Sequence, residues 1–317
     1  MTPHAPSDEL SIGDLAQIAC WLEVSAPKPG NVQPDRGFSD TSWFDFAAAA
    51  AAIAPVIDRA PERSVGETVL DAVRATIEAT GQNVNLGIIL LTAPLAATRE
   101  SRDPRSTVKQ VLRNLGPEDC TSVYEAIRLA SPGGLGRSPE DDVHGAPPAD
   151  LIDAMAKAED RDFIARQYAR DFEDIFEFSL PCLREVLCRK FPVEQSIVHL
   201  HLELLRRYPD SLIARKCGLE VAREASRRAA AVLEAGWPQG GNAPGDLEDL
   251  DRWLRADGNR RNPGTTADVV AATLFLALRT DIIKVSRSGD FGVLARMKLS
   301  GSPRDFVARL LELVREG

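Results

Sequence analysis

A lysine held between two prolines, in the run Pro27-Lys28-Pro29-Gly30, constrains this chain more than any other short feature. Proline fixes its own φ and disfavours the α conformation in the residue before it, so the preceding helix must end here. We therefore expect the Lys28 ammonium to be held out on a stiff, non-helical loop. Gly30 permits unusual backbone angles, and Asn31 adds an amide that donates and accepts. The loop is predicted to be either a phosphate cradle or an ordinary surface turn.

A second polar run, Thr80–Gly87, ends abruptly at a nearly unbroken apolar segment that is too short to cross a bilayer. This pattern predicts a buried helix with Asn83 or Asn85 as its N-cap. The free N–H groups and positive dipole end of such a helix suit an anion. Asn85 is therefore either a ligand-binding residue or a cap alone.

The helix before the lysine loop is predicted from the helical spacing of Leu15, Ile18 and Leu22. Glu23 then falls in its last turn, where a carboxylate opposes the helix dipole unless it meets a cation or a metal. Glu23 is thus a candidate functional residue, and a solvated helix-end acid is the alternative.

Farther along the chain, Asp210 and Ser211 precede a helical run predicted over residues 212–235. Either residue can cap that helix. Arg215 and Lys216 would lie in its first turn, where cations oppose the dipole and are better placed to bind an anionic ligand.

The turn Asn262-Pro263-Gly264 is expected to precede a helix that begins at Thr265 or Thr266. Thr265 and Asp268 have the spacing of a capping box, although the fourth residue of that motif is usually Glu or Gln. Two hydroxyls and a carboxylate beside the turn would also hold a magnesium–phosphate complex.

Residues 131–149 form the longest stretch without periodicity, which is typical of a lid, a binding loop or a linker. We interpret it as a mobile flap. Asp141, Asp142 and His144 could reach a metal from it, and a solvated acidic loop is the alternative.

The composition limits the class of protein. The chain has 317 residues, 44% hydrophobic content and a net charge of −9, which argues against non-specific nucleic-acid binding. Five cysteines without a CxxC pair indicate neither a disulfide framework nor a zinc site. No secretory signal and no membrane span are predicted, so a cytoplasmic location is expected.

The fold class follows from the pattern of elements. Many helical segments without strand–helix alternation, and the absence of GxxxxGK[ST] or GxGxxG, predict one all-α domain over residues 1–317.

Five ordered blocks carry a resemblance to a known family. They are EVSAPKPGNV, the FSD that follows it, NVNLG, DSLIARKCG from Asp210 and NPGTTAD from Asn262. Together they resemble the triphosphoribosyl-dephospho-CoA synthase family over about residues 20–278. That family usually has His-x-Asp where this chain has Phe38-Ser39-Asp40, and a motif with His and Lys where this chain has TGQNVNLG.

The resemblance implies an all-α fold and a transferase that moves the triphosphoribosyl group of ATP to a hydroxyl of dephospho-CoA or a related acceptor, with release of adenine. Mg²⁺ would accompany ATP. Asp40 is the preferred base or metal ligand, Glu23 is the second catalytic candidate, and Asp268 is a second metal ligand. The predicted nucleotide-binding residues are Lys28, Asn31, Asn83, Asn85, Gly87, Ser211, Arg215, Lys216, Thr265 and Thr266.

Two alternatives stay open. Phe38, Val84 and Leu86 remove polar groups that the family pattern contains, which favours a related phosphoribosyl-type transfer to another acceptor in a different cofactor pathway. The other alternative is a non-catalytic nucleotide-binding subunit.

Overall fold

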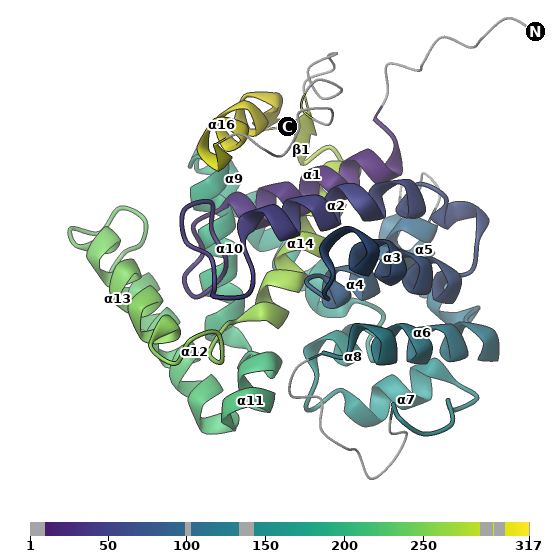
Figure 1. Ribbon diagram of the computed structural model, residues 1–317. Helices are drawn as coiled ribbons and strands as arrows, with labels where there is room; N and C mark the ends of the chain where they lie inside the picture. The colour runs from purple at the N-terminus through teal and green to yellow at the C-terminus, as the bar shows by residue number, and fades with distance from the viewer. Residues whose placement is uncertain (1–9, 99–102, 133–142, 286–293, 295–301, 317) are drawn as a thin grey trace, which may run out of the picture.

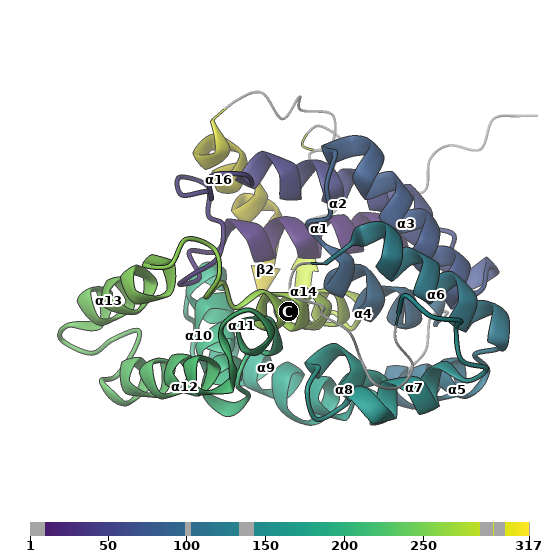
Figure 2. The same ribbon diagram turned by 60° about the horizontal axis from the view of Figure 1, so that its bottom comes forward.

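The computed structural model describes residues 10–98, 103–132, 143–285, 294 and 302–316, and they are overwhelmingly helical (Figures 1 and 2). The expected all-α class is confirmed. The longer α-helices are α1 (Ile12–Ser25), α2 (Trp43–Ile57), α3 (Val65–Thr80), α4 (Leu86–Ala97), α5 (Pro104–Arg113), α6 (Pro117–Ala130), α9 (Leu180–Cys188), α10 (Val193–Arg207), α12 (Leu219–Glu234), α13 (Ala243–Arg255), α14 (Gly264–Arg279) and α16 (Pro303–Leu313).

Shorter elements complete the described chain. They are the 3₁₀ turn η1 (Ala60–Glu62), α7 (Leu151–Ala158), α8 (Phe163–Ala169), the π-helical turn η2 (Ile175–Ser179), α11 (Ser211–Cys217) and the strands β1 (Ile283–Val285) and β2 (Val314–Glu316). The two strands pair antiparallel, with Lys284 opposite Arg315. This short ribbon joins the C-terminal segment to the end of α14 and does not alter the fold class.

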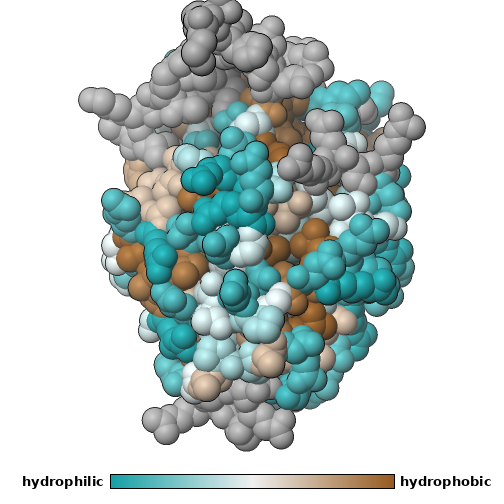
Figure 3. Space-filling view, turned by 90° about the vertical axis from the view of Figure 1, so that its right-hand side faces the viewer, coloured by the Kyte–Doolittle hydropathy of each residue, from teal (hydrophilic) through white to brown (hydrophobic). Residues whose placement is uncertain are grey.

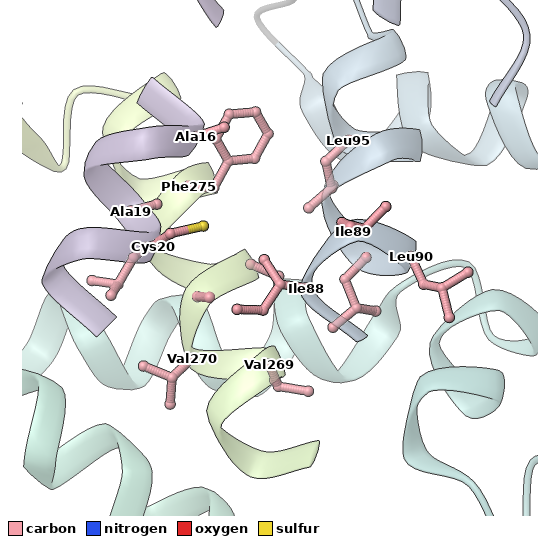
Figure 4. Close-up of a cluster of buried hydrophobic side chains, with 14 of the residues drawn as sticks. Ala16, Ala19, Cys20, Ile88, Ile89, Leu90, Leu95, Val269, Val270 and Phe275 are labelled. Atoms are coloured by element: carbon pink, nitrogen blue, oxygen red, sulfur yellow. The ribbon is translucent and has the colours of Figure 1, made fainter. Parts of the chain in front are cut away.

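Helix α14 lies at the centre of the helical body (Figure 1). From Val269 to Leu278 every residue is buried, and the helix contacts α1, α4 and α10. Figure 4 shows side chains of α1, α4 and α14, including Cys20, Ile88 and Phe275, within one apolar cluster. A helix that is apolar on all sides must be surrounded by other helices, so α14 positions its N-terminal residues deep inside the protein.

Helices α1 and α2 pack closely because small residues line their contact. A Cβ at Gly13 would lie 2.2 Å from the carbonyl oxygen of Ala54, and the Gly13 N–H donates to Asp58 Oδ1 at 3.2 Å. Ser11 and Asp14 form a capping box at the start of α1. Helix α1 ends at Ser25, before Pro27, as predicted.

One sequence-based expectation about helices is wrong, and one helix was missed. The single helix expected over residues 212–235 is two helices, α11 and α12, separated by Gly218 with φ of 91°. Only glycine adopts that angle without strain, and it breaks the helix. Helix α13 was not predicted, because its start lies within the Gly- and Pro-rich run 236–245, which reads as a connector.

The molecular surface mixes polar and apolar side chains. On the face in Figure 3, hydrophobic patches are interrupted by hydrophilic side chains. None of the helices within the described ranges is long and apolar enough to span a membrane. The buried hydrophobic side chains from α1 to α16 form one cluster; the interpretation of residues 1–317 as a single domain stays a prediction.

The close contact at Gly13 predicts that Gly13→Ala destabilises the protein by about 1–3 kcal/mol, because the added methyl group would overlap the backbone of α2. Urea unfolding measures this change. Gly241→Ala is the matched control, since a Cβ there meets nothing within 4 Å, and its free energy of unfolding should stay within about 0.5 kcal/mol of wild type. Equal stability of the two variants would contradict the close-packing argument.

Candidate active site

A cavity of about 580 Å³ lies where several helix ends meet. Its walls come from the end of α1, the loop after it, the starts of α4 and α14, and helices α6, α7, α8 and α11. Its polar and charged lining residues are Glu23, Asn31, Thr41, Asn83, Lys157, Arg161, Asp162, Arg215, Lys216, Asn259, Asn262, Thr265 and Asp268. The cavity size is typical of a small-molecule site.

Glu23 lines this cavity from the last turn of α1, and its cation is Lys28. The Lys28 ammonium lies 2.9 Å from Glu23 Oε1 and also donates to the Glu23 carbonyl oxygen. The Glu23 carboxylate, which opposes the dipole of α1, therefore does meet a cation, one of the two partners that were expected. The expectation that Lys28 projects from the loop is wrong: its side chain is 0% exposed and does not line the cavity.

The lysine loop is held by α13, which reaches it from outside the central body. Asp251 Oδ1 accepts from the Gly30 N–H at 2.7 Å, and Arg255 donates to the Asn31 carbonyl. Gly30 has φ of 78°, and a Cβ there would lie 2.8 Å from Leu254 and from Pro263. Glycine is thus required both by the angle and by the packing.

Asn31 lines the cavity, and one atom of its side-chain amide has no hydrogen-bond partner. Its Nδ2 donates to Asn262 Oδ1 at 2.7 Å, while its own Oδ1 is buried and has no hydrogen-bond partner in the structure. A buried acceptor without a partner is costly, so the Asn31 amide has unused hydrogen-bonding capacity at the cavity wall. The sequence identified Asn31, but not its partner Asn262.

The two asparagines before α4 have different roles. Asn83 lines the cavity, and its Oδ1 accepts from the Leu86 N–H at 3.0 Å, so its side chain caps the helix. Asn85 is buried outside the cavity lining, with its Oδ1 accepting from Thr76 at 3.0 Å and its Nδ2 unpartnered. Asn85 occupies the N-cap position of α4, one of the two predicted residues, but its side chain makes no hydrogen bond to the helix; Asn83, two residues earlier, supplies the side-chain acceptor.

Gly87 and Asp268 are in direct contact across the cavity wall. An added Cβ at Gly87 would lie 2.0 Å from Asp268 Oδ2. Burial raises the pKa of Asp268 well above its usual range, and the negative charges of Glu23 and Asp210 raise it further. Glu23 and Asp268 thus form a pair of repelling carboxylates, the arrangement that a bound cation relieves.

Asp210 joins the starts of α11 and α14. Its Oδ1 accepts from the Leu212 and Ile213 N–H groups at 2.9 and 3.0 Å, and its Oδ2 accepts from the N–H and hydroxyl of Thr266, both at 2.8 Å. The predicted cap of α11 is confirmed. The prediction of a capping box between Thr265 and Asp268 is wrong. The N-cap residue of α14 is Pro263, and no side chain of that cap bonds to the helix.

Ser211 and Thr265 belong to the same junction. The Ser211 hydroxyl donates to Thr265 Oγ1 at 3.0 Å, and both side chains are buried. Thr265 lines the main cavity, whereas Ser211 and Thr266 do not. Of the three predicted hydroxyl groups, only Thr265 is therefore brought to the cavity wall.

Arg215 and Lys216 both line the cavity, but not from the first turn of a helix as expected. They lie in the last turn of the short helix α11, where cations agree with the dipole. Arg215 pairs with Asp162 at 2.6 Å, an acid that the sequence did not single out, and its buried Nε has no partner. Burial lowers the pKa of Lys216, and the charge of Arg215 adds to the effect.

Asp40 is exposed and does not line the cavity. Gln82 Nε2 donates to its backbone carbonyl at 3.0 Å, and Ser42, not Asp40, is the N-cap of α2. The structure therefore does not bring Asp40 together with Glu23 and Asp268. Phe38, Val84 and Leu86, where the family pattern has polar residues, all line the cavity.

The predicted flap falls mainly on residues 133–142, which lie outside the described residues, so the metal prediction for Asp141 and Asp142 does too. Pro132 and Val143, at the two ends of that segment, line the cavity. His144 is exposed. Among the residues that the structure describes, no group of three or more His, Cys, Asp or Glu side chains could hold a metal.

An all-helical protein whose cavity gathers carboxylates, amides and cations at converging helix ends is suited to a phosphorylated ligand. Residues 9–286 match the family of ATP:dephospho-CoA triphosphoribosyl transferases, and the chain belongs to this family. It is accordingly a transferase of the triphosphoribosyl group, as the sequence blocks predicted. The family description names ATP and dephospho-CoA as the substrates.

A solved structure supports the same assignment. The chain is similar to a candidate triphosphoribosyl-dephospho-CoA synthase from Archaeoglobus fulgidus, with 26% identity and a TM-score of 0.57. The similarity covers 74% of this chain and 98% of that protein. No curated protein matches the chain.

The contact between Gly87 and Asp268 predicts that Gly87→Ala lowers kcat by about 10²-fold, because the new methyl group displaces the carboxylate and small misplacements are costly in catalysis. Steady-state kinetics measures the effect. Gly241→Ala, which adds a methyl group to open space, should leave kcat unchanged. Full activity of Gly87→Ala would show that Asp268 need not occupy its observed position.

Proposed function

We propose that the cavity is where this chain transfers the triphosphoribosyl group of ATP to a hydroxyl of dephospho-CoA. The observation that supports this most is the pair of carboxylates, Glu23 and Asp268, which line one cavity with the cations Arg215 and Lys216. A reaction that builds positive charge on a sugar and handles a triphosphate needs both kinds of group.

In the reaction, the acceptor oxygen bonds to the ribose C1′ and the bond from C1′ to the adenine nitrogen breaks. The acceptor hydroxyl loses a proton, and adenine leaves with a hydrogen on the nitrogen that held the sugar. Positive charge develops on the ribose ring as that bond breaks, as in glycoside hydrolysis. We assign Glu23 to stabilise this charge and to accept the hydroxyl proton. The assignment favours Glu23 over Asp40 because Glu23 lines the cavity and Asp40 does not.

The triphosphate would bind the cationic side of the cavity. Lys216 and Arg215, which both line the cavity, would be its donors. Asn31, which lines the cavity, would contact a ribose hydroxyl through its amide. Asn83 and Thr265 supply the remaining polar contacts from the starts of α4 and α14.

Mg²⁺ fits the acidic side of the cavity. Magnesium prefers oxygen ligands and is commonly held by one or two carboxylates together with substrate phosphates. Asp268 would hold it, because the nearby charge of Glu23 disfavours an uncompensated Asp268 carboxylate. When bound, the ion would neutralise phosphate charge.

The apolar part of the cavity wall is also compatible with an acceptor other than dephospho-CoA. Phe38, Val84 and Leu86 give the cavity an apolar wall, which favours an acceptor whose nearby portion is uncharged. A panel of hydroxyl acceptors, with dephospho-CoA among them, distinguishes the two possibilities by the mass of the product.

Wild-type protein is expected to release adenine from ATP in the presence of Mg²⁺ and dephospho-CoA, as measured by chromatography. Glu23→Gln removes the proposed base with little change in shape, so turnover should fall by about 10²-fold or more. Asp40→Asn is the matched comparison and should retain most activity. Absence of adenine with every acceptor would overturn the transferase assignment for this chain, while a larger loss in Asp40→Asn would return the catalytic role to Asp40.

The raised pKa of Asp268 predicts a pH dependence of metal–nucleotide binding. Below that pKa the carboxyl carries a proton that must leave before Mg²⁺ can bind, so affinity should rise with pH through it, by at most about tenfold per unit. Titration calorimetry with MgATP between about pH 5 and 8 measures the trend. Asp268→Asn should bind more weakly and lose this component of the pH dependence. An identical pH profile in wild type and variant would contradict the assignment of Asp268.

A further inference from the structure

Lys28 is the buried cation beside the proposed base. Its side chain is 0% exposed, and its Nζ lies 2.9 Å from Glu23 Oε1. The same ammonium donates to the carbonyl oxygens of Glu23 and Ala26, the latter at 3.4 Å. All three acceptors belong to the end of α1 and the residue after it, so Lys28 folds back onto the helix that carries Glu23.

The Lys28 side chain is enclosed by protein. Lys28 is absent from the cavity wall, whereas Glu23 forms part of it. His201 lies near Lys28 from α10, and its burial together with the charge of Lys28 lowers its pKa to about 3. A neutral imidazole neither competes with nor neutralises the ammonium. In the described part of the chain, Glu23 is the one carboxylate paired with Lys28.

The loop fixes this geometry through its backbone. The Lys28 N–H donates to the Ala26 carbonyl at 2.7 Å, and the Lys28 carbonyl accepts from Gln33 Nε2 at 2.9 Å. Pro27 and Pro29 restrict the angles on either side. The side chain of Lys28 therefore leaves the loop in a direction set by a rigid backbone, which is what a positioning group requires.

We propose that Lys28 is a positioning residue, which holds the Glu23 carboxylate toward the reacting sugar and does not contact the triphosphate. The inference rests on the proposed function, in which Glu23 acts on the substrate. A buried ion pair orients its partner because the carboxylate loses its interaction if it rotates away from the ammonium. Lys28 thus acts only through Glu23.

A double-mutant cycle tests this inference. Lys28→Met keeps an unbranched side chain one heavy atom shorter and removes the charge, so kcat should fall by about tenfold or more while the KM for ATP stays within about twofold. In the Glu23→Gln background, Lys28→Met should cost no further activity, because the group that it positions is already gone. Lys109→Met, which removes a surface lysine paired with Asp171, is the matched control and should leave the kinetics unchanged.

Two results would overturn the proposal. A rise in the KM for ATP in Lys28→Met, beyond that of the control, would show that Lys28 contacts the nucleotide. If the loss of kcat in the double variant equals the product of the losses in the two single variants, Lys28 acts independently of Glu23. Failure of the proposed function itself would appear differently, as absence of adenine release from wild type.

Loss of folding is distinguished from loss of positioning by thermal unfolding. Lys28→Met alone leaves Glu23 buried without its cation and should lower the melting temperature, whereas the double variant removes both charges and should recover part of that loss. The comparison of Glu23→Gln with the double variant decides the question even when Lys28→Met is too unstable to assay. A double variant less active than Glu23→Gln, at equal folded fraction, counts against the proposal.

Discussion

The cavity depends on one buried carboxylate, that of Asp210. Its two oxygens accept four hydrogen bonds, two from the first turn of α11 and two from Thr266 at the start of α14. Helix N-termini leave N–H groups without partners inside their own helix, and Asp210 satisfies such groups on two helices at once. Burial raises the pKa of this carboxyl, and the hydrogen bonds it accepts act in the opposite direction. Because α11 carries Arg215 and α14 carries Asp268, this junction sets the distance between the cationic and acidic sides of the cavity.

The two carboxylates on the acidic side of the cavity, Glu23 and Asp268, differ in whether a cation is paired with them. Glu23 has Lys28 as a partner behind it, whereas Asp268 faces Glu23 and contacts Gly87 without an ion pair in the described structure. Cys20 lies one turn earlier on α1, and burial together with these two carboxylates raises its thiol pKa, so it is not a nucleophile. Of the two carboxylates, Glu23 is thus compensated by a cation of the protein, and Asp268 has no ion pair among the described residues.

Much of this arrangement could be predicted from local sequence. Proline restrictions and apolar spacing predicted the end of α1 and the start of α4, and dipole reasoning indicated a cation or a metal at Glu23, with a solvated acid as the alternative. The identity of that cation was missed because Lys28 reads as a loop residue and its burial depends on α10 and α13. Similarly, a single residue, Gly218, changed Arg215 and Lys216 from first-turn to last-turn positions. Asp162 and Asp251 carry no motif; their roles come from partners 53 and 221 residues away.

At residues 30 and 31 of the lysine loop, helix α13 binds main-chain atoms: Asp251 accepts from the Gly30 N–H and Arg255 donates to the Asn31 carbonyl. Such a clamp recognises the path of the chain and not the identity of its side chains. Changes of side chain elsewhere on the cavity wall, as at Val84 and Leu86, would therefore leave this clamp in place. Substrate preference can diverge within this fold while the backbone frame of the cavity is inherited intact.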